Sequence, residues 1–292
     1  MVDLMFIGIV ASFIGATLQA INYILTQNCQ QKYNIDGVKL LVATHAAMGF
    51  FALIPAILFD YWRYIHPSQY IDFIKINLPY LIAQYLLIRA IKLSDASVAS
   101  PLLALKIPVL ALISWLVLQQ SFSIQQWGAI AIIVAMAWRF STMSGDISLK
   151  PLLLVFIACI GYSCSDLAVT DFSHRVPGSS PIEKVMVTMT INYLVVGVLS
   201  LPLMVTNKVS ITMVYQAKWV GFAWFSGVIL LVIGFNLSGV VSGNIVQSLR
   251  GIIGIALAFV FFRHQINQPM SLWKNKMLTA LIMVAAIGLF YI

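Results

Sequence analysis

The sequence predicts an all-α membrane protein with ten transmembrane helices, and three observations lead to this fold class. Of the 292 residues, 61% are hydrophobic and only 9% are charged, whereas about a quarter of the residues in a soluble domain are charged. Mean hydropathy is +0.96, and no polar stretch is long enough to form a separate soluble domain. The apolar runs are long and continuous, unlike the alternating strands of a membrane β-barrel.

Ten apolar runs follow one another, each close to the length of about 20 residues that a helix needs to cross the hydrocarbon layer. They cover residues 4–24, 38–59, 77–92, 97–118, 125–140, 151–171, 183–205, 219–236, 242–262 and 275–292. Only a few residues separate the third run from the fourth and the eighth from the ninth, so each of these pairs is predicted to form a tight antiparallel hairpin.

The pattern of runs repeats in the two halves of the chain. A shift of 144 residues places Leu93-Ser94 on Leu237-Ser238 and Leu105-Lys106 on Leu249-Arg250. A shift of 145 places Lys39 on Lys184, and a shift of 146 places Ile14-Gly15 on Ile160-Gly161. These nearly equal offsets predict an internal repeat, with five-helix halves at residues 1–144 and 149–292. Because five crossings are an odd number, the halves have opposite orientations. Inverted repeats are typical of secondary transporters, whose substrate site lies at the repeat interface near the midplane.

One stretch resembles a known family. Between Ala90 and Ala135 the chain has Ala-Ser pairs at 96–97 and 99–100, Pro108 inside an apolar run, and Gln-Trp-Gly at 126–128 opening the next run. It resembles the EamA domain of the drug/metabolite transporter superfamily. The resemblance covers the whole chain at the level of the span pattern, and it implies ten helices built from two inverted five-helix repeats. We expect a multi-pass protein of the cytoplasmic (inner) membrane.

Two cations lie where hydrocarbon should exclude them. Lys106 and Arg250 are near the middle of the fourth and ninth runs, at equivalent positions of the repeat. Such a residue at a helix centre costs about 2.5–3.5 kcal/mol on insertion scales. We therefore expect both to face a hydrated cavity between the halves. Two hypotheses stay open: they bind an anionic group of a substrate, or each is a structural ion-pair partner, for example of Asp166.

The backbone near these cations is predicted to be interrupted. Pro108 removes a hydrogen-bond donor and frees the carbonyl of Ala104, and Gly251 and Gly254 weaken the helix that follows Arg250. Interruptions at corresponding points of two repeats indicate a binding site. Superfamily members that carry phosphorylated or nucleotide-linked metabolites place basic residues on helices four and nine, so the resemblance favours a carboxylate or phosphate on the substrate.

Further residues inside the runs are candidates for the same cavity. Asp166 is the only clearly intramembrane carboxylate, and it is predicted to reach the interface, to hold a gate by a salt bridge or to carry a proton. His45 suits proton coupling because histidine titrates near neutral pH, although a hydrogen-bonded packing role is the alternative. The predicted substrate-binding residues besides Lys106 and Arg250 are Gln247, which shares a helix face with Arg250, and Tyr80, Gln84, Asn192 and Trp224.

No motif for catalysis is present. The sequence has no metal-ligand spacing, nucleophile elbow or glycine-rich phosphate loop, and its three cysteines are not arranged as metal ligands. We therefore expect no enzyme activity, no cofactor and no metal, and transport driven by a gradient. The net charge of +8 comes mostly from Lys and Arg residues at the predicted helix ends. We expect these residues to set the topology and to contact lipid headgroups, and not to bind nucleic acid. The expected partners are a small-molecule substrate and the lipid bilayer, with the protein a monomer.

The sequence leaves the orientation open. Connections after odd-numbered runs hold 11 Lys and Arg residues and those after even-numbered runs hold 4. The positive-inside rule then puts both termini outside the cytoplasm, whereas the family resemblance implies both inside.

The predicted function is secondary transport, by alternating access, of a small organic metabolite with a carboxylate or phosphate group. The protein would act as an exchanger (antiporter) or a proton- or ion-coupled carrier. The alternative is a broad exporter of amino acids or other metabolites. A lipid-handling membrane enzyme or flippase subunit is the less favoured class.

Overall fold

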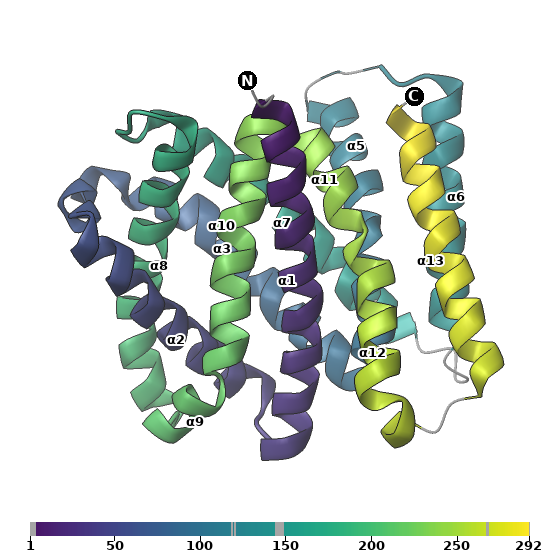
Figure 1. Ribbon diagram of the computed structural model, residues 1–292, viewed down its shortest axis with the longest axis horizontal. Coiled ribbons are helices and arrows are strands. Elements are labelled where there is room, and N and C mark those ends of the chain that lie inside the picture. The colour runs from purple at the N-terminus through teal and green to yellow at the C-terminus, as the bar shows by residue number, and fades with distance from the viewer. Residues whose placement is uncertain (1–3, 118, 120, 144–148, 267–268, 292) are drawn as a thin grey trace.

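The computed structural model describes residues 4–117, 119, 121–143, 149–266 and 269–291, and these are almost entirely helical (Figure 1). The α-helices of the described residues are α1 (Leu4–Tyr33), α2 (Gly37–Leu58), α3 (Tyr70–Leu93), α4 (Ala96–Leu102), α5 (Lys106–Val117), α6 (Ile124–Thr142), α7 (Leu149–Arg175), α8 (Pro181–Thr206), α9 (Ile211–Gln216), α10 (Lys218–Ser238), α11 (Val240–Ser248), α12 (Arg250–Ile266) and α13 (Met270–Tyr291). Short 3-10 turns lie at Tyr61–Tyr64, Pro67–Gln69 and Leu103–Leu105.

The predicted fold class is confirmed. Within the described residues, nine helical segments are long and apolar enough to cross a membrane, and Ile124–Phe140 is a shorter apolar helix. The last residues of the fourth and tenth predicted runs, 118 and 292, and residue 144, the predicted end of the first half, lie outside the described residues.

Several predicted runs are shorter than the helices that contain them, among them the first, third and sixth. The first run is predicted to end at residue 24, but α1 continues to Tyr33 because its polar side chains there are buried and paired. The side-chain oxygen of Gln27 accepts a hydrogen bond of 2.8 Å from the Ala96 N–H, and Gln30 donates one of 3.5 Å to the Ile88 carbonyl. Likewise α7 extends to Arg175, which places Asp166 deeper inside its helix than the sequence predicts.

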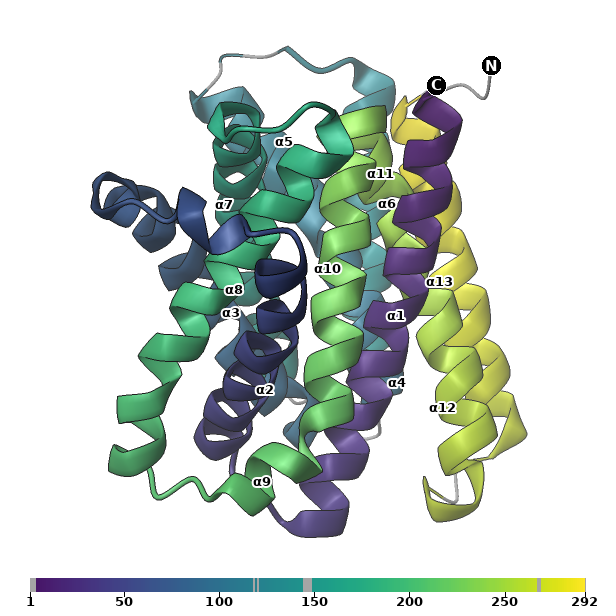
Figure 2. The same ribbon diagram turned by 60° about the vertical axis from the view of Figure 1, so that its left-hand side comes forward.

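The helices pack in pairs that join the two halves of the chain. The α1 helix lies against α10, α3 against α7, α2 against α8, α4 against α12 and α6 against α13 (Figures 1 and 2). Each of these pairs joins a helix that lies before residue 144 to a helix that lies after residue 148. The α1 helix begins and α13 ends at the same end of the bundle (Figure 1). The interface between the halves therefore runs through the centre of the protein.

Candidate functional site

Two interrupted spans position the central cations. The fourth span consists of α4, a 3-10 turn at Leu103–Leu105, and α5, which begins with Lys106. Pro108 follows within the first turn of α5 and has no N–H to donate to the Ala104 carbonyl, as the sequence analysis predicts. The ninth span consists of α11, which ends at Ser248, and α12, which begins with Arg250. Each cation therefore starts the second helix of its span.

The glycines of the ninth span have a different role from the predicted one. The interruption lies before Arg250 and not after it, and α12 is helical through Gly251 and Gly254. A Cβ atom on Gly251 would lie 2.9 Å from the Cα of Pro101, so the residue allows α12 to approach α4 closely. At this crossing the Ser100 hydroxyl donates a hydrogen bond of 3.1 Å to the Arg250 carbonyl. The two interruptions thus lie face to face.

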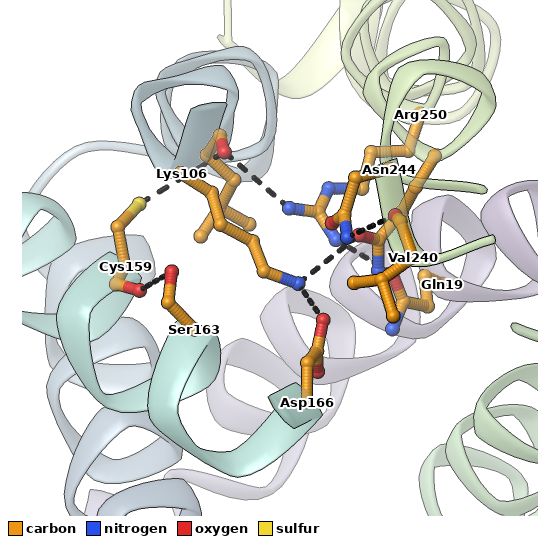
Figure 3. Close-up of polar contacts among 10 residues, drawn as sticks. Gln19, Lys106, Cys159, Ser163, Asp166, Val240, Asn244 and Arg250 are labelled. Carbon is orange, nitrogen blue, oxygen red and sulfur yellow. Dashed lines mark hydrogen bonds and ion pairs between the residues drawn. The ribbon is translucent and has the colours of Figure 1, made fainter. Parts of the chain in front are cut away.

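Lys106 is balanced by a carboxylate. Its side chain is 3% exposed, and its Nζ forms an ion pair with Asp166 of α7 (Figure 3). The same nitrogen donates a hydrogen bond of 3.3 Å to the side-chain oxygen of Gln247. The ion-pair hypothesis therefore describes the geometry of Lys106. Asp166 lies nine positions before the end of α7, and its side chain is 19% exposed.

Arg250 has only neutral partners. Its Nη1 donates to the side-chain oxygen of Gln19 at 2.7 Å and its Nη2 to the Leu103 carbonyl at 3.5 Å, while Gln247 donates to the same Gln19 oxygen at 2.9 Å. The residue is 4% exposed, and its Nε has no hydrogen-bond partner among the described residues. The described salt bridges include no carboxylate within 4.0 Å of this guanidinium.

The two cations lie in the wall of a central cavity of about 40 Å³. Its charged lining residues are Lys106, Arg250 and Asp166, so the formal charge of the lining is +1. The predicted residues Gln247, Tyr80, Asn192 and Trp224 line it as well. The volume holds a few water molecules, whereas pockets for small organic ligands measure about 300–1,000 Å³. In this conformation the cavity is too small for an organic metabolite.

Aromatic rings form the wall next to the polar residues. The ring centroids of Tyr80, Tyr162 and Trp224 are 5.9–6.3 Å apart, and Tyr23 lies 6.1 Å from Trp224. Tyr23 and Tyr162 were not predicted as site residues. A signal for both is present in the sequence, because each lies four positions from a polar cavity residue on one helix face, Gln19 or Asp166.

Two predicted residues do not line the cavity. Gln84 lies behind it and accepts a hydrogen bond from the Tyr162 hydroxyl, so it holds a ring of the wall. His45 is buried, with Nδ1 2.7 Å from the Leu41 carbonyl and its ring 5.5 Å from that of Tyr80. Its Nε2 has no hydrogen-bond partner among the described residues.

The cavity wall also contains a pair of amides. Asn192 of α8 and Asn77 of α3 exchange hydrogen bonds of 2.7 and 3.2 Å. Sequence reasoning selects only Asn192 of the two.

The predictions from the sequence do not include a second buried ion pair, which joins α13 to the turn before α4. Lys276 of α13 has no exposed surface, and its Nζ lies 3.5 Å from the Asp95 carboxylate and 2.7 Å from the Ser97 hydroxyl. Asp95 also caps α4 by accepting from the Val98 N–H at 3.1 Å. The predicted tenth run begins at residue 275, so the sequence places Lys276 at the first turn of that run, next to the polar connection, where it is counted with the residues of the connection. Because α13 begins at Met270, the lysine lies inside the bundle.

Comparisons with known proteins agree with this architecture. Residues 6–142 match the model of the EamA-like transporter family. A search of curated proteins finds no match. Among solved structures, 18 chains are similar. One, titled "Crystal structure of protein", is 14% identical, with the alignment covering 97% of this chain and 95% of that chain at a TM-score of 0.61. At this identity the similarity shows the fold alone. The protein is an integral multi-pass membrane protein.

Proposed function

We propose that this EamA-family membrane protein, whose family domain spans residues 6–142, is a secondary transporter of a small organic metabolite with a carboxylate or phosphate group. It works by alternating access in the cytoplasmic (inner) membrane, as an exchanger or a proton- or ion-coupled carrier. The substrate binds in the central cavity between the two interrupted spans, and the gradient of a solute or ion drives the cycle.

One observation carries the proposal: the guanidinium of Arg250 is buried, and the described residues provide no carboxylate within 4.0 Å of it. A charge inside a membrane protein is costly unless something compensates it, and a charge-assisted hydrogen bond is among the strongest polar contacts. An anionic substrate supplies the missing counter-charge. It displaces the oxygens of Gln19 and Leu103, which are weaker neutral acceptors, and brings the net charge of the lining to zero if it is monovalent.

Lys106 and Asp166 have a different part in this mechanism. While Asp166 is ionised it holds Lys106, and a proton on Asp166 releases the ammonium group toward the substrate. The Lys106–Asp166 pair therefore supports proton coupling. The aromatic wall of Tyr80, Tyr162 and Trp224 covers the apolar part of the metabolite.

The alternative is a broad exporter of amino acids or other metabolites. It is favoured by the Asp166 carboxylate in the same cavity as Arg250, since a zwitterion needs an acceptor for its ammonium group as well as a cation for its carboxylate. In this reading the substrate ammonium replaces Lys106 beside Asp166.

Counterflow into liposomes that contain the purified protein tests both readings. The labelled solutes are a monocarboxylate, a phosphorylated sugar and a neutral amino acid. Exchange of either anion supports the proposal, and exchange of the amino acid alone supports the alternative. If the protein exchanges none of the solutes but turns over a lipid substrate in the same vesicles, the transporter proposal is wrong.

The coupling role of Asp166 is tested by the pH dependence of uptake. Asp166→Asn cannot take up or release a proton, so its uptake should vary with pH less than that of the wild type. Asp171→Asn is the matched control, because Asp171 lies on the same helix, is 73% exposed and pairs with Arg175. An Asp166→Asn variant that keeps the wild-type pH profile would contradict the coupling role.

A further inference from the structure

A second, larger hollow lies outside the central site. It is a groove of about 620 Å³ between α2 and α8, closed at one end by α9 and the start of α10. Its lining is almost wholly apolar, with Phe50, Val198, Leu201, Met204 and Val214 among the residues that form it. Val198 and Leu201 are 65% and 57% exposed. Because α2 and α8 are membrane-spanning segments, this groove faces the hydrocarbon layer.

The shape of the groove follows from one helix crossing. Gly49 of α2 and Gly197 of α8 meet so closely that a Cβ atom on Gly49 would lie 2.5 Å from the Gly197 Cα. The two helices cross obliquely at this point (Figure 1), so they separate on either side of it. Small residues at the contact and larger ones away from it leave a wedge, and α9 closes the wedge at its end (Figure 2).

The closed end of the groove is cationic and aromatic. Lys218 lines it together with Tyr215, and the lysine Nζ lies 3.5 Å from the centroid of the Tyr215 ring and 5.7 Å from that of Trp219. The described salt bridges give Lys218 no carboxylate within 4.0 Å. The lysine lowers the pKa of the Tyr215 phenol, and exposed Tyr and Trp rings are typical of the membrane interface.

The same end of the bundle carries further exposed cations. They lie at the ends of α1, α3 and α8, and they are Lys32, Arg89, Lys92 and Lys208. Packing of Cys29, Ile88 and Val209 with Ala217 in one apolar cluster brings these helix ends together. Basic clusters next to membrane spans attract anionic lipid headgroups. The groove therefore joins an apolar channel at hydrocarbon depth to a cation at headgroup depth.

We propose that this groove binds one acyl chain of an anionic phospholipid, whose phosphate pairs with Lys218. An amphiphile with a long apolar chain and a negative head matches the groove along its whole length, from the glycine crossing to α9. The bound lipid fills the wedge between α2 and α8, two helices that contribute to the packing around the central cavity. It is independent of the identity of the transported solute.

Native mass spectrometry of the delipidated full-length protein tests the proposal. The added ligands are phosphatidylglycerol, phosphatidylcholine and inorganic phosphate. We expect one phosphatidylglycerol molecule to bind tightly. Leu201→Trp fills the groove and should remove this adduct, whereas Leu199→Trp should keep it, because Leu199 lies on the same helix, is 59% exposed and does not line the groove.

The headgroup contact has its own pair of variants. Lys218→Gln should lower the affinity for phosphatidylglycerol roughly fivefold, the effect of one cation at a membrane surface, and leave phosphatidylcholine unaffected. Lys75→Gln is the control, because Lys75 is exposed, lies near the start of α3, at the opposite end of that helix from Lys92, and does not line the groove; it should not change the affinity.

Three results would overturn the proposal. The first is equal lipid binding by the Leu201→Trp and Leu199→Trp variants. The second is a phosphate adduct without a phosphatidylglycerol adduct, which would mean that the cationic end of the groove binds an anion but the groove does not bind an acyl chain. The third is a lipid-free dimer that Leu201→Trp dissociates, which would mean that a second copy covers the groove.

Discussion

The two interrupted spans place cations at equivalent positions but surround them differently. In the first half, Lys106 is paired with Asp166 of α7. In the second half, the hydrogen bonds that Arg250 donates among the described residues go to the neutral oxygens of Gln19 and Leu103. The first cation is therefore compensated within the protein, while the second is the one that our proposal assigns to an anionic ligand. Equivalent positions and equal charge thus do not imply equal roles.

The hairpins that precede these two spans also differ from each other. The turn before α4 holds Asp95, which pairs with Lys276 and caps the helix. The corresponding turn before α11 holds Gly239, whose φ of +87° belongs to the region that favours glycine. The first hairpin is fixed by charge and the second by backbone conformation.

The largest effect is expected at Lys276. Lys276→Met leaves the Asp95 carboxylate, whose side chain is 10% exposed, without its cation, and breaking a buried pair costs about 3–5 kcal/mol. The melting temperature in detergent should fall strongly. Lys274→Met is the control, because Lys274 is exposed on the same helix. Equal melting temperatures for the two variants would show that the buried pair does not stabilise the first hairpin.

Lys106→Gln should have the next largest effect on stability. It leaves Asp166 without a counter-charge, and we expect a loss of about 1–3 kcal/mol. The loss is smaller than at Lys276 because the Asp166 side chain is 19% exposed. The double variant Lys106→Gln/Asp166→Asn should recover the melting temperature but not the uptake of an anion. Wild-type uptake by the double variant would exclude Lys106 from substrate binding.

Arg250→Gln should lower affinity for an anionic substrate without a comparable loss of stability. The removed contact is worth about 1.5–3 kcal/mol, which is roughly a ten- to hundredfold change in affinity. No described carboxylate is stranded when the guanidinium is removed, so the melting temperature should stay close to that of the wild type. Arg250→Lys keeps the charge and should retain part of the affinity. A lowered melting temperature with normal uptake would assign Arg250 a structural role.

The loss of stability expected at Gly239 is no larger than that expected for Lys106→Gln. Gly239→Ala forces a side chain into a backbone region that is unfavourable for it, at a cost of about 1–3 kcal/mol. Gly128→Ala is the control, because Gly128 lies inside α6 with no atom within 4 Å of an added Cβ. It should be neutral or stabilise by a few tenths of a kcal/mol up to about 1 kcal/mol. Equal melting temperatures would mean that the second hairpin tolerates a side chain.

The sequence predicts the spans and the depth of the cations well, because each depends on local composition. Apolar length locates the membrane helices, and Pro108 locates the interruption before α5. The helix ends are predicted less well. Gln27 and Gln30 look like residues of a polar connection, but hydrogen bonds to the α3–α4 hairpin keep them inside the bundle.

The sequence by itself determined that this is a ten-run helical membrane protein with two cations at matching depths. The length of the apolar runs and the spacing of residues along the chain determine these features, because both depend on neighbouring residues alone. Only the tertiary structure decided that Asp166 neutralises Lys106 and not Arg250, that Lys276 is buried against Asp95, and that Tyr23 and Tyr162 join the cavity wall. These outcomes depend on which helices pack together across the two halves, and a side chain's charge or polarity does not encode its partner.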